Sequence, residues 1–431
     1  MDGFVDHLAS QNSKGFWKLV RTLTKNSGKS EIIPPLLNID NSEIEVDDNI
    51  KADLLNKYFT SVSTIDDRDI DVPDVDLKTD RQITNIHITI DDIKDIIKIL
   101  KLGKANGNDG ISHHMLKYTV ETVVVPLYIL FNMSLSEKQF PILWKKALVM
   151  PLFKSNDRHI PSNYRPISLL STVCKVFERC IFKYLHNYML DNKLFYEFQS
   201  GFLPNHSTTY QLIELYHHIC LNREKNEHTC LIFCDISKAF DKVWHRGLLA
   251  KLQSYGFSGN LYYFLKNYLA DREQAVIISN HVSSYRKTNA GVPQGSVLGP
   301  FLFLIFINDI ADNLISLARL FADDTSLLHS SKRLNDIERH IHTDLDTILD
   351  WANKWLVTFN PSKTEILVIS NRQVSDINIR FRNNIINSTD THKHLGITFS
   401  SDGKWTAHIQ NIGNSALRGM DKSLSAILDL T

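Results

Sequence analysis

The sequence predicts an α+β fold, because strand-like and helix-like patterns of apolar residues both occur in it. The run Cys230–Cys234 is short and uniformly apolar, which is typical of a buried strand, and it ends at Asp235. Two further apolar runs flank Asp323 and Asp324, which indicates a β-hairpin with these two carboxylates at its tip. Between residues 337 and 355, apolar side chains recur at intervals of three and four, as on the buried face of a helix.

The composition is that of an ordinary globular protein. Of the 431 residues, 43% are hydrophobic and 22% are charged, which allows a large core and two or three domains. The formal net charge of +0 gives no indication of a nucleic-acid partner. The five cysteines form no Cys-x-x-Cys pair, so we expect free thiols in a reducing compartment. Without a charged-then-apolar leader, and with Val297–Ile307 too short to cross a bilayer, we expect an intracellular protein with no membrane contact.

The first quarter of the chain is the least regular part. Residues 12–26 place apolar side chains on one helical face and lysines and arginines on another, which suits either a phosphate backbone or a merely solvated surface. Residues 27–50 resemble a loop, and residues 49–62 a short amphipathic helix. The stretch Asp66–Asp80 is rich in aspartate and poor in apolar residues, so we expect a linker.

Regular elements follow from residue 89. Thr89 and Asp92 form a capping-box pattern, and we expect the helix that they begin to end at Gly103. The remaining elements are expected in this order: a Gly/Asn/Asp loop at 104–110, helices to 136, a strand at 144–154, a turn at 163–170 that leads into a helix ending near 191, a loop from 199 and a helix to 223.

The second half continues with the strand at 230–234 and the same kinds of pattern. We expect helices within 246–270, a hairpin of 274–279 with 284–289, an apolar helix at 297–307, a helix at 337–355, a strand at 365–369, a hairpin through Leu395 and Gly396, and a helix or two within 404–428.

The three carboxylates Asp235, Asp323 and Asp324 carry the chemistry. Charges about 4 Å apart repel by roughly 4 kcal/mol near a protein surface, and a divalent cation between them would reverse this repulsion. A solvated acidic turn is the simpler interpretation of an Asp-Asp pair, but Asp235 at the end of a second strand argues against it. One carboxylate on a strand and two on a hairpin suit a two-metal site for phosphoryl transfer, and oxygen-only ligands favour Mg²⁺. The sequence contains neither a Walker loop nor a Gly-x-Ser-x-Gly elbow.

A series of short motifs follows the chain in order. These motifs are Lys104-Ala105-Asn106-Gly107-Asn108-Asp109-Gly110, Asn163-Tyr164-Arg165-Pro166-Ile167-Ser168, Gln199-Ser200-Gly201-Phe202, Asp235-Ile236-Ser237-Lys238-Ala239-Phe240-Asp241, Gly291-Val292-Pro293-Gln294-Gly295-Ser296, Phe321-Ala322-Asp323-Asp324, Lys363 and His394-Leu395-Gly396. The series resembles the reverse transcriptases of non-LTR (LINE-type, jockey-like) retrotransposons over about residues 100–399. Each motif alone is weak evidence, whereas the ordered series is specific.

The resemblance implies catalytic and metal-binding roles. Asp235, Asp323 and the backbone carbonyl of Ile236 would hold two Mg²⁺ ions, for which Mn²⁺ is a possible substitute, and Asp324 would be the weaker, supporting carboxylate. Lys363 would lie near the departing pyrophosphate, where an ammonium group can donate a proton.

The resemblance also implies binding roles. Phe240 would lie under the incoming sugar and leave no room for a 2′-hydroxyl, while Gln294 and Gly295 would approach the nascent base pair. The cations that would bind the triphosphate are Lys154 and Arg165. The template and primer would contact Lys104, Gly291, Pro293 and Gly396.

The implied architecture is a right-hand polymerase with helical fingers, an RRM-like antiparallel palm sheet and a partial thumb. Its expected divisions are an N-terminal helical and linker region at 1–84, fingers at 85–225, palm at 226–400 and the start of a thumb at 401–431. The implied partners are an RNA template, a DNA primer or target and dNTPs, in a nuclear or cytoplasmic ribonucleoprotein.

Alternatives remain for single residues and for the whole chain. Asp241 would be an ion-pair partner rather than a ligand, Lys363 a solvated turn residue and Phe240 simple core, and Arg165 would brace a turn. The alternative functions are an RNA-dependent RNA polymerase, which Phe240 disfavours, and an inactive or domesticated relic that binds nucleic acid. Because such elements usually carry an endonuclease, we also expect a truncated copy or an excised segment.

Overall fold

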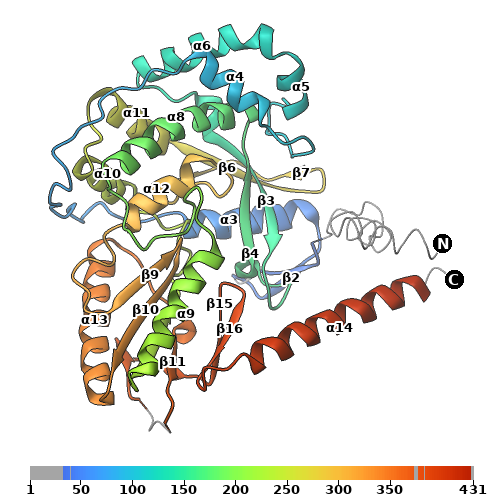
Figure 1. Ribbon diagram of the computed structural model, residues 1–431. Helices are drawn as coiled ribbons and strands as arrows, with labels where there is room; N and C mark the ends of the chain where they lie inside the picture. Colours follow the sequence, from blue (N-terminus) through green and yellow to red (C-terminus); the bar gives the residue numbers. More distant parts are fainter. Residues whose placement is uncertain (1–32, 39, 373–376, 383, 429–431) are drawn as a thin grey trace, which may run out of the picture. The chain divides into compact units, whose positions relative to one another are not determined.

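The computed structural model (Figure 1) describes residues 33–38, 40–372, 377–382 and 384–428, without the side chains beyond residue 418. The helix expected at 12–26 lies outside the described residues. The chain forms two compact units, of which one spans Pro34–Asp390 and the other contains Thr391–Thr431. All five cysteines are free, as expected. None of the described helices combines the length and the apolar character that a membrane crossing requires.

The central sheet of the larger unit has the strand order β14-β11-β5-β10-β9. Its strands are β5 (His228–Cys234), β9 (Leu317–Phe321), β10 (Asp324–Ser331), β11 (Glu365–Ile369) and β14 (Asn387–Ser388). Every pair is antiparallel except β11 with β14, and β5 is buried over its whole length. Helices α9 (Thr208–Glu224) and α13 (Leu334–Lys354) pack on this sheet (Figure 1). The strands expected at 230–234 and 365–369 and the Asp-Asp hairpin are confirmed.

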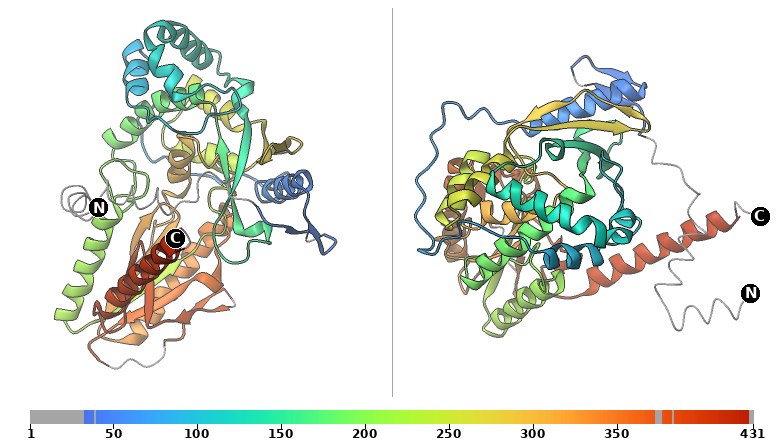
Figure 2. Two further views of the ribbon diagram at one scale, coloured as in Figure 1. Left: turned by 90° about the vertical axis from the view of Figure 1, so that its right-hand side faces the viewer. Right: turned by 90° about the horizontal axis from the view of Figure 1, so that it is seen from above.

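A second sheet has the order β4-β3-β6-β7, with β8 also paired to β6. It consists of β3 (Lys146–Phe153), β4 (Tyr164–Leu169), β6 (Arg272–Ile278), β7 (His281–Val282) and β8 (Arg286–Thr288). The turn expected at 163–170 was wrong, because these residues form β4. Pro166 is tolerated there because β4 is an edge strand. Helix α3 (Asp48–Val62) packs across β6, β7 and β8, as the right-hand view of Figure 2 shows.

A layer of helices lies next to the second sheet (Figure 1). They are α4 (Ile90–Lys98), α5 (His113–Tyr118), α6 (Val120–Ser136), α7 (Ile142–Lys145), α8 (Thr172–Asp191), α10 (His245–Ser254), α11 (Gly259–Leu269) and α12 (Leu298–Ile307). The capping box of Thr89 and Asp92 is confirmed, although the helix ends at Lys98, a turn before Gly103. Stacked and edge-on aromatic rings, among them Phe131, Phe140, Phe177 and Phe264, fill the core of this layer.

The acidic segment 66–80 has no helix or strand, but it is packed rather than free, which corrects the expected linker. The Asp67 side chain accepts a hydrogen bond of 2.6 Å from the Trp244 indole, and Lys78 donates its backbone N–H to Ser254. Ile70, Val72 and Val75 pack against the core between the aspartates. Because aspartates alternate with apolar residues, this extended segment packs its apolar side chains against the core and leaves most of its aspartates in contact with solvent.

The remaining elements are short. The loop expected at 27–50 instead contains a hairpin of β1 (Leu36–Asn38) with β2 (Glu43–Glu45), and β12 (Arg380–Phe381) pairs with β13 (Asn384–Ile385). Two 3₁₀ turns, η1 (Pro161–Asn163) and η2 (Pro361–Lys363), precede β4 and β11. In the smaller unit, β15 (Thr391–His394) pairs with β16 (Ile397–Ser400), and α14 (Thr406–Leu428) follows.

Candidate active site

The hairpin of β9 and β10 holds two of the three candidate carboxylates. Phe321 pairs with Asp324, so the turn consists of Ala322 and Asp323 alone. Ala322 has φ +57°, a left-handed conformation that tight hairpin turns require. The turn therefore presents Asp323 at its tip and begins β10 with Asp324.

The third carboxylate arrives from the neighbouring strand. Thr325 of β10 pairs with Cys234 of β5, so the next residues along these antiparallel strands are Asp324 and Asp235. The register thus brings Asp235, Asp323 and Asp324 together where β5 ends and β10 begins, although Asp235 and Asp323 are far apart in the sequence.

Burial and neighbouring negative charge raise the pKa of two of these carboxylates. Burial and the charge of Asp235 raise the pKa of Asp323, and burial with the charges of Asp323 and Asp235 raises the pKa of Asp324 to about 6. A cluster of carboxylate oxygens that repel one another has the donor chemistry that a divalent cation prefers. Within the described residues, no three His, Cys, Asp or Glu side chains are already arranged as metal ligands.

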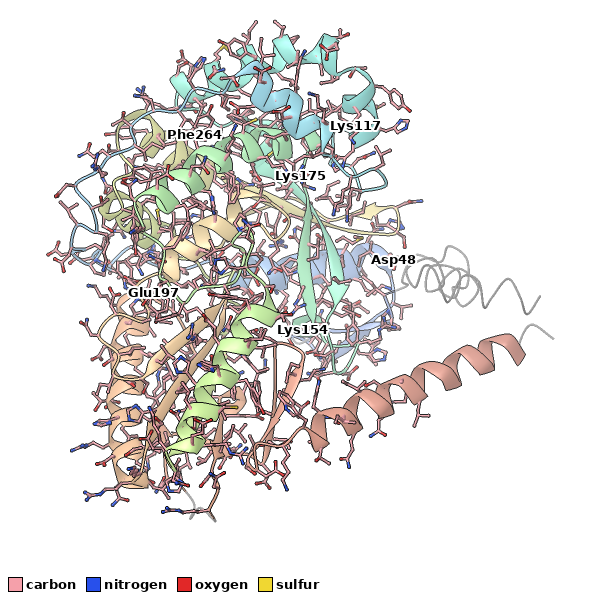
Figure 3. The ribbon with its side chains drawn as sticks, in the orientation of Figure 1. Asp48, Lys117, Lys154, Lys175, Glu197 and Phe264 are labelled. Carbon is pink, nitrogen blue, oxygen red and sulfur yellow. The ribbon has the colours of Figure 1, made fainter. Side chains whose placement is uncertain are left out.

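Cations lie opposite the carboxylates. The Lys363 ammonium is 3.7 Å from Asp235 Oδ2, and the backbone carbonyl of Asp235 accepts a hydrogen bond from Asn360, which begins the same turn. Lys154 lies at the end of β3 (Figure 3), and burial with the nearby charges of Arg165 and Lys363 lowers its pKa. An anionic group bound between these cations would relieve their mutual repulsion.

The loop Gly291–Ser296 packs closely against the backbone of Asp241 and Ser168. At Gly291 (φ +81°), a Cβ would lie 2.6 Å from the Asp241 carbonyl oxygen, and at Gly295 (φ +126°) it would lie 2.5 Å from that of Ser168. The backbone N–H of Ser168 donates to the Gln294 carbonyl over 2.7 Å. Both glycines are therefore needed for close approach within the protein itself, whatever they also allow for a substrate.

Asp241 has a different partner from the one that the sequence suggested, and Phe240 is packed without being fully buried. The side chain of Asp241 accepts a hydrogen bond of 2.7 Å from the Gln294 amide, so its direct partner is an amide rather than the expected cation. Burial raises the pKa of Asp241. The ring of Phe240 stacks on Phe303 at 4.5 Å but is only half-buried, so it is both packed and accessible.

Two candidate residues are not shown beside the carboxylates. Lys104 is exposed in a loop packed against the start of α8, where a Cβ on Gly107 would lie 2.4 Å from the Ser171 nitrogen. Gly396 belongs to the smaller unit, in the turn between β15 and β16, with φ +94°.

The sequence reasoning assigned no role to two residues that the structure places at the site. The Lys238 ammonium donates to the Ser162 carbonyl and lies 5.3 Å from the ring centre of Tyr58. Charges of Lys363 and Arg165 contribute, after burial, to lowering the pKa of Lys238. The sequence did offer a signal for Lys238, because this residue lies between Asp235 and Asp241 in one motif. Tyr58 gave no signal, because α3 reaches the site only through tertiary packing.

Comparison with known proteins now identifies the family. The family model described as "Reverse transcriptase (RNA-dependent DNA polymerase)" matches residues 152–399, more than half of the chain. The chain belongs to the reverse transcriptase family. The matched range includes all three carboxylates and both cations beside them.

Three of the relatives within the reverse transcriptase family come from transposons of one fly species. The chain is 34% identical over 334 residues to the probable RNA-directed DNA polymerase from transposon BS of Drosophila melanogaster, covering 75% of this chain and 37% of that protein. It is 32% identical to the RNA-directed DNA polymerase from mobile element jockey of the same fly, over 75% of this chain and 36% of the relative. A third relative, the probable RNA-directed DNA polymerase from transposon X-element, is 28% identical over 74% of this chain and 36% of its own length. The chain thus spans little more than a third of the length of these relatives. Reverse transcriptases as a family use divalent metal ions.

Proposed function

We propose that this chain is the RNA-directed DNA polymerase of a non-LTR retrotransposon, which extends a DNA 3′-hydroxyl with dNTPs on an RNA template. The observation that carries the proposal is the convergence of Asp235, Asp323 and Asp324 where β5 ends and β10 begins, opposite Lys363 and Lys154. Membership of the reverse transcriptase family supplies the reaction class.

In this proposal the larger unit supplies fingers and palm. The helices α4 to α8 with β3 and β4 form the fingers at 85–225, and the central sheet with α13 is the main part of the palm at 226–400. The strands β6 to β8 come from the palm range in sequence but belong to the sheet of β3 and β4. Helix α14 is the start of a thumb.

The side chains would divide the work as follows. Asp235, Asp323 and the Ile236 carbonyl hold two Mg²⁺ ions, with Asp324 in support; bound there, the ions stabilise the attacking and leaving oxygens of the phosphoryl transfer. Lys154 and Arg165 bind the triphosphate, and Lys363, beside Asp235, donates a proton to the departing pyrophosphate.

The remaining contacts concern the sugar, the base pair and the nucleic acid. The ring of Phe240 rejects a 2′-hydroxyl, and Gln294, fixed by Asp241, lies against the nascent base pair. Lys104, Gly291, Pro293 and Gly396 contact template or primer. Such a polymerase works as a ribonucleoprotein in the nucleus or cytoplasm.

Primer extension tests the proposal directly. With Mg²⁺, an RNA template and a DNA primer, the chain should incorporate dNTPs, and Asp323→Ala should lower the rate by about a thousandfold because a metal ligand contributes several kcal/mol to the transition state. Asp346→Ala, an exposed aspartate on α13, is the matched control and should keep the wild-type rate. Preferential use of rNTPs would favour an RNA-dependent RNA polymerase, and no synthesis by the wild type would favour the relic.

A further inference from the structure

The segment Tyr196–Gly201 runs alongside β9, the edge strand that leads to the hairpin tip. The Tyr196 hydroxyl donates to the Ala318 carbonyl over 3.1 Å, and the Phe198 ring lies 4.2 Å from the Arg319 guanidinium. Leu320 then exchanges two backbone hydrogen bonds with this segment, donating to Phe198 (3.1 Å) and accepting from Ser200 (2.9 Å). The segment therefore covers an edge that would otherwise present unpaired backbone groups.

Gln199 extends this contact to the turn itself. Its side chain is 2% exposed, and its Oε1 accepts hydrogen bonds from the backbone N–H of Ala322 (3.0 Å) and of Gly201 (2.7 Å). Ala322 is the left-handed residue of the turn and directly precedes Asp323. One buried oxygen thus ties the strained residue of the turn to the segment beside it.

Gly201 completes the contact by having no side chain. A Cβ there would lie 2.1 Å from the Ala322 nitrogen and 2.8 Å from its Cα, distances that real Cβ atoms essentially never show. The two backbones can approach this closely only with glycine at position 201.

We propose that Gln199 and Gly201 are positioning residues for the two-residue turn, and that they set the affinity of the carboxylates of Asp323 and Asp324 for a divalent cation. This inference rests on the proposed function and deepens it. The Gln199 oxygen and the Gly201 backbone both contact Ala322, and Ala322 sets the direction in which Asp323 leaves β9.

The variants distinguish the effect of losing the accepting oxygen of Gln199 from the effect of a change in side-chain size. Gln199→Met has a similar shape but no oxygen, so it leaves two buried N–H groups without a partner, whereas Gln199→Glu keeps an oxygen in the same place. Gly201→Ala pushes the two backbones apart. The matched control is Gln211→Met, because Gln211 on α9 is 1% exposed and its amide makes no hydrogen bond within the described residues.

Two readouts are needed, the titration of each variant with Mn²⁺ by calorimetry and the Mg²⁺ concentration for half-maximal primer extension. We expect Gln199→Met and Gly201→Ala to bind Mn²⁺ about tenfold more weakly than the wild type and to need correspondingly more Mg²⁺. Gln199→Glu and Gln211→Met should bind Mn²⁺ at least as tightly as the wild type. A thermal melt identifies any variant that fails to fold. If either Gln199→Met or Gly201→Ala fails to fold, the Mn²⁺ affinity of the other one tests the inference.

The outcomes are distinguishable. Wild-type Mn²⁺ affinity in Gln199→Met and Gly201→Ala, or equal weakening in Gln199→Glu and Gln199→Met, would overturn the inference. A wild type that binds Mn²⁺ but extends no primer would contradict the proposed function, while its comparison with Gln199→Met would still decide the inference. A wild type that binds no Mn²⁺ would overturn both.

Discussion

The buried carboxylate of Glu178 on α8 accepts a hydrogen bond of 2.5 Å from the backbone N–H of Val297, the N-cap residue of α12. Glu178 is fully buried and also accepts from the Tyr268 hydroxyl over 3.0 Å. An acidic group at a helix N-terminus satisfies N–H groups that have no partner in the helix. Gln294 and Gly295 lie in the loop that leads through Ser296 and Val297 into this helix, so Glu178 anchors the end of that loop.

Removal of this carboxylate should be costly. Glu178→Leu leaves buried donors unpaired and removes the acidic group near the Arg272 charge, so we expect the free energy of unfolding to fall by about 3–5 kcal/mol. Glu178→Gln keeps an accepting oxygen and should lose only about 1–2 kcal/mol. Urea denaturation followed by tryptophan fluorescence measures both losses, and equal losses would show that the oxygen has no special role.

Gly295 offers a test of close approach as distinct from backbone strain. Gly295→Ala places a Cβ 2.5 Å from the Ser168 carbonyl oxygen, so we expect the loop to move and KM for dNTPs to rise about tenfold, a loss of roughly 1.4 kcal/mol of binding. Gly110→Ala is the matched control, because Gly110 also has a positive φ (+68°) but a Cβ there meets nothing within 4 Å. The prediction fails if both variants change KM equally.

Phe202 supports the residue that we propose for sugar selection. The Phe202 ring lies edge-on to Phe240 at 5.7 Å, whereas Phe303 stacks on Phe240 at 4.5 Å, and Phe202 is 49% exposed. Aromatic pairs of this kind contribute about 0.5–1.5 kcal/mol, so Phe202→Ala should lower the selectivity for dNTPs over rNTPs by about twofold to tenfold.

The ratio of kcat/KM for one dNTP and the matching rNTP gives this selectivity. Tyr263→Ala is the control, since Tyr263 is similarly exposed (56%) but lies on α11. Unchanged selectivity in Phe202→Ala would mean that Phe303 alone orients Phe240.

The carboxylates and their strands could be predicted because their signals are local. The apolar runs that end at Asp235 and flank Asp323 are typical of buried strands, and the structure has them in that form. Strand β4 was missed because Pro166 is usually a sign against a strand, and only the position at a sheet edge, opposite Pro151, makes it acceptable. The partner of Gln199 could not be read from the sequence, because Ala322 is 123 positions away and their contact depends on the packing of a whole sheet edge.

Lys251 provides a pH-dependent test of the core. Its ammonium is fully buried beside Asp309, donates to the Phe306 carbonyl over 2.6 Å and lies 3.9 Å from the ring centre of Trp355. Burial outweighs the attraction of Asp309 and lowers the pKa of Lys251 to about 8. In the unfolded chain the pKa returns to about 10.4.

The sign of the effect follows from proton binding. Below pH 8 both states carry the proton, so the cost of burying the charge is fully present; between about pH 8 and 10.4 only the unfolded state keeps it, so this group makes the protein more stable as pH rises. Lys251→Met removes this contribution. We therefore expect the unfolding free energy of the wild type, measured by urea denaturation relative to Lys251→Met, to rise from pH 7.5 to pH 10. A difference that stays constant or falls over this range would show that Asp309 keeps Lys251 charged throughout.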